Sequence, residues 1–199
     1  MANYSNIFVN EGLSYRNYRD LIESQLEKGL TTGGDNSESM LNFTRLNVQR
    51  MNRIEKSAVL IEPLITAIQK LKKHYHLLVI SEGWCGDAAQ IVPVFDKMTK
   101  ISPEKFDMRF IFRDTHLPLM DAHLFNGTRS IPVLLVLDDS GELILKWGPR
   151  PAILQQLLNG WRMENPDHEV WSEKLHLWYA RDKTQHTQLE LIALVEGLE

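Results

Sequence analysis

The sequence predicts an α/β domain in which a central mixed sheet is flanked by helices, with N-terminal and C-terminal helical extensions. Three observations predict this fold class. Short apolar runs at 76–81 and 107–114 are typical of buried strands, and the helical pattern between them indicates a crossover. A third apolar stretch, at 132–147, is interrupted by Asp-Asp-Ser-Gly, which is typical of a tight hairpin turn. Together they predict one parallel and one antiparallel pair of strands.

The chain before the first strand has a helical pattern. Ser14 is placed to cap a helix that ends at Gly29, a second helix begins near Met40, and Pro63 begins a third. Asn47 interrupts the apolar stripe of the second helix, and we interpret it as a polar contact inside a packed interface.

The second helix also carries several basic residues. They suggest an anion-binding patch, but charges on a helix most often belong to a solvated face, which is the interpretation we adopt. The residues concerned are Arg45, Arg50, Arg53 and Lys56.

The remaining segments continue the α/β pattern. We expect helices over 88–101, over 117–125 and from Pro151 to Trp161. The last segment, 162–199, has helical patterns in which we see no chemistry. With 199 residues, 43% of them hydrophobic, the chain suffices for one substantial core.

These patterns divide the chain into three regions. Residues 1–57 are expected to form an N-terminal helical extension, 58–161 the main α/β domain, and 162–199 a C-terminal helical extension.

Composition excludes several function classes. Lys and Arg number 22 against 26 Asp and Glu, so no basic excess favours nucleic acid or a membrane surface as partner. No leader-like or membrane-spanning apolar run is seen, and we expect a cytoplasmic protein. A single cysteine excludes a disulfide framework and a thiolate-rich zinc site. The histidines are scattered, so we expect no metal and no cofactor.

Four features in order resemble the thioredoxin superfamily, in a variant with a single active-site cysteine. They are Trp84-Cys85-Gly86 after a strand, Pro93 eight residues after the cysteine, Ile131-Pro132 before an apolar hairpin, and Gly148 after it. The resemblance covers roughly 58–161. It implies a thioredoxin-like fold in which the Ile131-Pro132 bond is cis and faces the cysteine.

The chain departs from that family at important positions. The second cysteine of the thioredoxin motif is replaced by Ala88, and the proton-shuttling strand carboxylate by Val79. Without a resolving thiol, a mixed disulfide on Cys85 persists until an outside thiol displaces it, so the dithiol reductase cycle is excluded. Glu82, three residues before the cysteine, is an alternative source of a nearby carboxylate, but an acidic loop residue is more often solvated, which is the interpretation we adopt.

The candidate catalytic residue is Cys85, at the expected start of a helix. The positive end of the helix should favour its thiolate, whereas the carboxylate of Asp87 should raise its pKa, and the net direction stays open. The expected substrate-binding residues around it are Trp84, Gly86, Asp87, Ile131 and Pro132.

Two functions remain, and the first is favoured because Cys85 is expected to be exposed. It is a monothiol redox protein, or thiol-disulfide oxidoreductase, that forms mixed disulfides with a client protein or small thiol. The second is a non-catalytic thioredoxin-fold module that binds a peptide or protein. A cluster-holding monothiol glutaredoxin is a lesser option, because that family has Cys-Gly-x-Ser where this chain has Cys-Gly-Asp-Ala. The sequence leaves the oligomeric state open.

Overall fold

The structure is a computed structural model that describes residues 2–198. Its elements, in chain order, are α1 (Ser5–Asn10), α2 (Tyr15–Glu27), α3 (Glu38–Ser57), α4 (Glu62–Lys70), β1 (Tyr75–Ser81), α5 (Gly86–Ile101), β2 (Phe106–Phe112), a 3₁₀ turn η1 (Arg113–Thr115), α6 (Leu117–Asp121), β3 (Val133–Leu137), β4 (Leu143–Trp147), α7 (Ala152–Glu164), α8 (His168–Asp182) and α9 (Gln185–Glu196).

Among the described residues, the strands form one four-stranded sheet in the order β2-β1-β3-β4. β1 and β2 are parallel and α5 connects them, whereas β3 pairs antiparallel with both β1 and β4. The predicted mixed sheet and hairpin are confirmed. The hairpin turn closes where the amide of Gly141 donates to the carbonyl of Asp138. β1 and β3 are almost wholly buried because they lie in the middle of the sheet.

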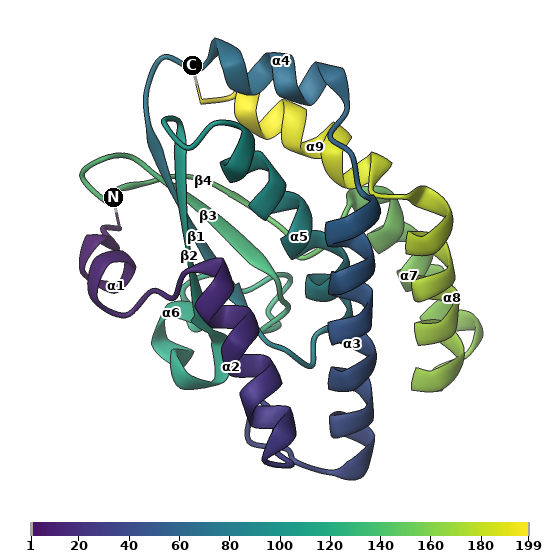
Figure 1. The fold of residues 1–199 in the computed structure, drawn as a ribbon. Coiled ribbons are helices and arrows are strands. Elements are labelled where there is room, and N and C mark those ends of the chain that lie inside the picture. Colours follow the sequence, from purple (N-terminus) through teal and green to yellow (C-terminus); the bar gives the residue numbers. More distant parts are fainter. Residues whose placement is uncertain (1, 199) are drawn as a thin grey trace.

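The N-terminal helices pack against the main domain (Figure 1). Ser14 caps α2 as expected, since its side chain accepts from the amide of Asn17. Tyr18 of α2 is buried: its ring stacks on Phe110 of β2, and its hydroxyl lies 2.9 Å from the Ser81 hydroxyl. α3 lies beside α5. Thus α2 and α3 bring N-terminal side chains to the end of β1.

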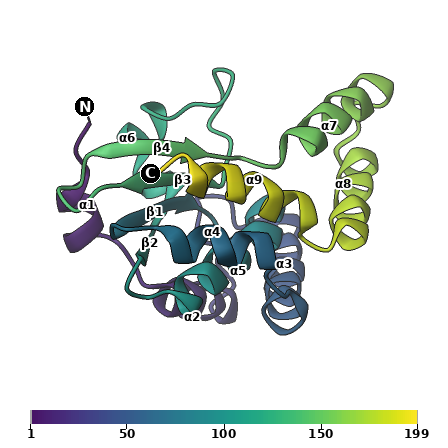
Figure 2. The same ribbon diagram turned by 90° about the horizontal axis from the view of Figure 1, so that it is seen from above.

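The C-terminal helices separate into two groups. α9 lies alongside α4, as Figures 1 and 2 both show, and the fully buried Gln188 of α9 accepts from the amide of Ile61 and donates to the carbonyl of Val59. α7 and α8 pack against each other at the end of the domain (Figure 2). This pair extends the surface beside the start of α5.

Three details differ from the sequence prediction. The run 107–114 is a strand only to Phe112, after which the chain turns into η1, and the helix expected over 117–125 ends at Asp121. The helix α1 was not expected. Just before it, the amide of Tyr4 donates to the carbonyl of Gly141 and so fixes the start of the chain to the β3–β4 hairpin turn. Over residues 2–198, no helix is both long and apolar enough to cross a membrane.

Candidate functional site

Cys85 lies where β1 has ended and α5 begins. It is the N-cap residue of α5, and its Sγ accepts a long hydrogen bond, 3.4 Å, from the amide of Ala88. The thiol donates to the carbonyl oxygen of Ile131, 3.3 Å away. The Ile131-Pro132 bond is cis, as the resemblance implied. Cys85, Ile131 and Pro132 are therefore neighbours, although they are far apart in sequence.

The expectation of an exposed cysteine is wrong in this structure, and the direction of its pKa, which the sequence left open, is upward. Cys85 is only 7% exposed and Ile131 only 4%. Burial, and after it the charge of Asp87, raise the pKa of the Cys85 thiol to about 12, against the smaller lowering effects of the Ala88 amide and Arg150. The positive end of α5 is thus outweighed by burial, and the thiol is protonated at neutral pH.

Asp87 is held by residues from two distant segments. Arg150, which follows β4, contacts both of its carboxylate oxygens, with Nε 3.1 Å from Oδ1 and Nη2 2.7 Å from Oδ2. The hydroxyl of Tyr179 on α8 also donates to Oδ1, at 2.6 Å. Both members of the ion pair have side chains only 10% exposed. Asp87 therefore joins the start of α5 to the C-terminal extension.

Gly86 lies under a side chain of the same helix α8. A Cβ atom on Gly86 would lie 2.7 Å from Cε1 of His176, which is closer than carbon atoms approach without displacement. Burial lowers the pKa of His176 to about 4, so its imidazole is neutral at neutral pH. The glycine thus provides the space that His176 occupies.

Trp84 and Glu82 have different environments. Trp84 is half-buried, and the guanidinium of Arg113 lies 4.5 Å from its ring. Glu82 is fully buried, so the interpretation of a solvated loop residue is wrong. Its carboxylate accepts from the hydroxyl of Thr32 and from the amide of Asp114. Burial raises the pKa of Glu82 to about 7.

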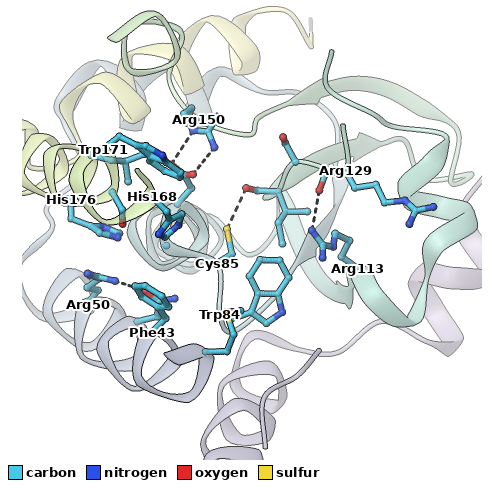
Figure 3. A pocket seen from close by; sticks show the side chains of 18 of the residues that line it. Phe43, Arg50, Trp84, Cys85, Arg113, Arg129, Arg150, His168, Trp171 and His176 are labelled. Atoms are coloured by element: carbon cyan, nitrogen blue, oxygen red, sulfur yellow. Dashed lines mark hydrogen bonds and ion pairs between the residues drawn. The ribbon is translucent and has the colours of Figure 1, made fainter. Parts of the chain in front are cut away.

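A pocket of about 440 Å³ opens beside Cys85 (Figure 3). Figure 3 shows Cys85 between side chains of α3 and α8 on one side and Arg113 and Arg129 on the other. The lining residues, grouped by segment, are Met40, Phe43, Asn47 and Arg50 of α3; Trp84, Cys85, Gly86 and Asp87; Arg113; Thr128, Arg129, Ser130 and Ile131; Arg150 and Arg162; and His168, Trp171, Ser172, Leu175 and His176 of α8.

The pocket contains aromatic rings in mutual contact. The ring of Phe43 meets that of His168 edge-on at 5.6 Å, and His168 meets Trp171 at 4.5 Å. The guanidinium of Arg162 lies 4.2 Å from the Trp171 ring. These contacts connect α3, α8 and α7 around one wall, so the helical extensions complete a cavity that the sheet alone does not enclose.

Comparison with known proteins agrees with the thioredoxin-like fold. A family described as Thioredoxin matches residues 33–165, two thirds of the chain. The chain belongs to the thioredoxin family. No curated protein matches it. Solved structures of similar fold include that of a protein of unknown function from Pseudomonas aeruginosa, with 22% identity over 94% of this chain and 99% of that one and a TM-score of 0.54.

A second solved structure of similar fold is that of an HIV epitope-scaffold. Its identity is 19% over 93% of this chain and 99% of that one, with a TM-score of 0.52. At these identities the likeness concerns the fold, and it extends over the helical extensions as well as the sheet.

The expected site residues of this thioredoxin-family protein lie close together. All of them line the pocket except Pro132, which follows Ile131 but is not among the lining residues. The contribution of α8 to the pocket wall was missed, since nothing in 162–199 was expected to lie at the site. A signal was present in the sequence. The spacing of five residues puts them on one face of a helix: His168, Trp171, Leu175, His176 and Tyr179. The solvated-face interpretation is also wrong for Arg50, which lines the pocket.

Away from the pocket, one group of residues has the composition of a metal site. Ligand atoms of His74, His76 and Asp139 lie within 4.8 Å of one another. Hydrogen bonding accounts for their placement: Nδ1 of His74 lies 3.0 Å from Oδ1 of Asp139, and Nδ1 of His76 lies 2.5 Å from Oδ1 of Asp107. The group lies at the start of β1, whereas Cys85 follows the end of that strand.

Proposed function

We propose that this thioredoxin-family protein is a non-catalytic binding module whose ligand occupies the pocket beside Cys85. The observation that carries the proposal is the buried, protonated thiol in the wall of a pocket of about 440 Å³. A pocket of this size is typical of small-ligand sites. The thiol serves as a hydrogen-bond donor to the carbonyl of Ile131 and helps to hold the wall in place.

Two further features support binding without thiol chemistry. Nucleophilic attack on a disulfide requires the thiolate, and a pKa of about 12 leaves a negligible thiolate fraction at neutral pH. The position of the resolving cysteine is occupied by Ala88, which is itself buried. The site therefore lacks both the reactive form of the first thiol and the second thiol of the family's redox cycle.

The monothiol redox function is the second candidate. It is favoured by the position of Sγ, at the N-terminus of α5 and against the cis bond before Pro132, where the family's reactive sulfur lies. In that function the thiolate of Cys85 attacks a disulfide sulfur and releases the other half as a thiolate. An outside thiol then displaces Cys85 from the mixed disulfide.

Reaction with an uncharged disulfide reagent distinguishes the two candidates. Reduced protein is mixed with dipyridyl disulfide, and the adduct on Cys85 is followed by mass spectrometry in the native and the urea-unfolded protein, with Cys85→Ser as the blank. The binding-module proposal expects the native rate to be at least about a hundredfold lower, because only the unfolded thiol ionises readily. A native rate equal to or above the unfolded rate would refute the proposal and support the redox function.

A further inference from the structure

The pocket carries more positive charge than its carboxylates neutralise. Of its five arginines, Arg150 is paired with Asp87, Arg113 with Asp114 and Arg129 with Asp121. Within residues 2–198, the other two, Arg50 and Arg162, have no carboxylate partner. Arg162 is exposed and lies over Trp171, whereas Arg50 is half-buried. A partly buried cation without a counter-ion is costly, and a bound anion removes that cost.

Arg50 is positioned by a buried neighbour. Asn47, one turn earlier on α3, is fully buried, and its side-chain oxygen accepts from Nη1 of Arg50 at 2.6 Å. Its amide group donates to the carbonyl of Gly83, at 3.1 Å, just before Trp84. The guanidinium is thereby held at the wall of the pocket, with the rest of its planar set of donors left for a ligand.

His176, a second polar residue of this wall, has a ring nitrogen that is unpaired among the described residues. Nδ1 of His176 is a buried atom that has no hydrogen-bond partner within the described part of the chain. His176 and Arg50 both line the pocket, and Figure 3 shows them on the same side of Cys85. Buried polar atoms normally have partners, so an unpaired one here indicates a group supplied by a ligand.

Beside these donors the wall is lined with aromatic rings. Phe43 and Trp171 are joined through the ring of His168, and Trp84 stands at the other side of the cysteine. Aromatic walls of this kind suit a planar apolar group. The pocket therefore combines a site for a negative group with a surface for a ring.

We infer that the pocket binds a small aromatic anion whose carboxylate or phosphate lies against Arg50 and His176, while its ring packs among Phe43, Trp84 and Trp171. This inference rests on the proposed binding function and names its ligand class. Arg50 is the anchoring cation, because planar guanidinium groups pair with both kinds of anion in two-point fashion. Asn47 is a positioning residue that acts through Arg50.

Titration with simple probes tests the inference. Benzoate, phenyl phosphate and the uncharged benzamide are titrated into the protein, with tryptophan fluorescence and calorimetry as readouts. Wild-type protein is expected to bind at least one of the anions more tightly than benzamide, and comparison of the two anions distinguishes carboxylate from phosphate. Arg50→Gln is expected to weaken anion binding roughly tenfold to a hundredfold, the loss of one charged hydrogen-bonding group.

Arg45→Gln is the matched control, because Arg45 is on the same helix but pairs with the exposed Glu38 outside the pocket. It is expected to leave the affinity unchanged. The inference is overturned if neither anion binds the wild-type protein, if benzamide binds as well as the anions, or if Arg50→Gln binds as tightly as wild type. Fast native reaction of Cys85 with dipyridyl disulfide refutes the proposed function separately, so the two failures are distinguishable.

Discussion

Asp87 and Arg150 form a two-point ion pair that joins the first turn of α5 to the segment after β4, with oxygen-nitrogen distances of 3.1 and 2.7 Å. Both side chains are about nine-tenths buried. Because a buried pair is costly to break from one side, this contact predicts a large effect of a small substitution. It also explains how a carboxylate is accommodated two residues from a buried thiol.

Asp87→Asn should lower the free energy of unfolding by about 3 kcal/mol, because it leaves the guanidinium of Arg150 buried without a counter-ion. Urea denaturation measures this change. The matched control is Asp121→Asn, which removes a two-point partner from Arg129 on the surface and should have a much smaller effect, because water and salt screen an exposed pair. Equal effects of the two substitutions would contradict the role assigned to the buried pair.

Gly86→Ala should destabilise the protein by about 1–3 kcal/mol, since the added methyl meets the imidazole of His176 at 2.7 Å. Combining it with His176→Ala should recover most of the loss. Gly160→Ala is the control: nothing lies within 4 Å of a Cβ at this position of α7, so it should be neutral or stabilise by up to about 1 kcal/mol. Thermal unfolding compares these three variants and the single variant His176→Ala with wild type, and failure of the double variant to recover would contradict the clash.

Glu82→Gln should change how stability depends on pH. The folded pKa of Glu82, about 7, lies above its ordinary value of 4.5 because of burial. The stability contributed by protonation is therefore fully present below the ordinary pKa and is lost as pH rises through about 7. The effect is on the order of 3 kcal/mol, since a tenfold change in proton affinity corresponds to about 1.4 kcal/mol.

The measurement is the free energy of unfolding of wild type and Glu82→Gln between pH 5 and pH 8, a window set by these two pKa values. The wild type should lose stability relative to the variant as the pH rises. Glu104→Gln, at an exposed position, should run parallel to wild type. Parallel curves for Glu82→Gln and wild type would show that the carboxyl group does not titrate in this range.

Much of the fold could be predicted from local patterns. β1 and β3 are short apolar runs in the middle of the sheet, and the Asp138–Gly141 turn has the residues that a tight hairpin requires. The end of β2 was less predictable. The strand was expected to run to residue 114, but it ends at Phe112, and the amide of Asp114 in the following 3₁₀ turn donates to the carboxylate of Glu82. Such a tertiary contact has no local sequence signature.

The candidate site was predicted in part for the same reason. Cys85 and Ile131 were paired through a family resemblance, and they are in contact. The burial of the thiol depends on the whole fold, including helices outside the motif, and no local pattern reports it. Tyr179 and His176 were missed because their contacts with Asp87 and Gly86 span about ninety residues of chain and depend on how α8 packs.

The rate of alkylation of Cys85 by iodoacetamide as a function of pH shows whether the native thiol is reactive. In the reduced native protein, we expect very slow reaction at neutral pH and an apparent pKa well above the ordinary thiol value, towards about 12, because burial and Asp87 both oppose the thiolate. The unfolded protein should react with an ordinary thiol pKa. A native apparent pKa at or below the ordinary value, with fast reaction at neutral pH, would contradict the buried, protonated thiol on which the binding-module proposal rests.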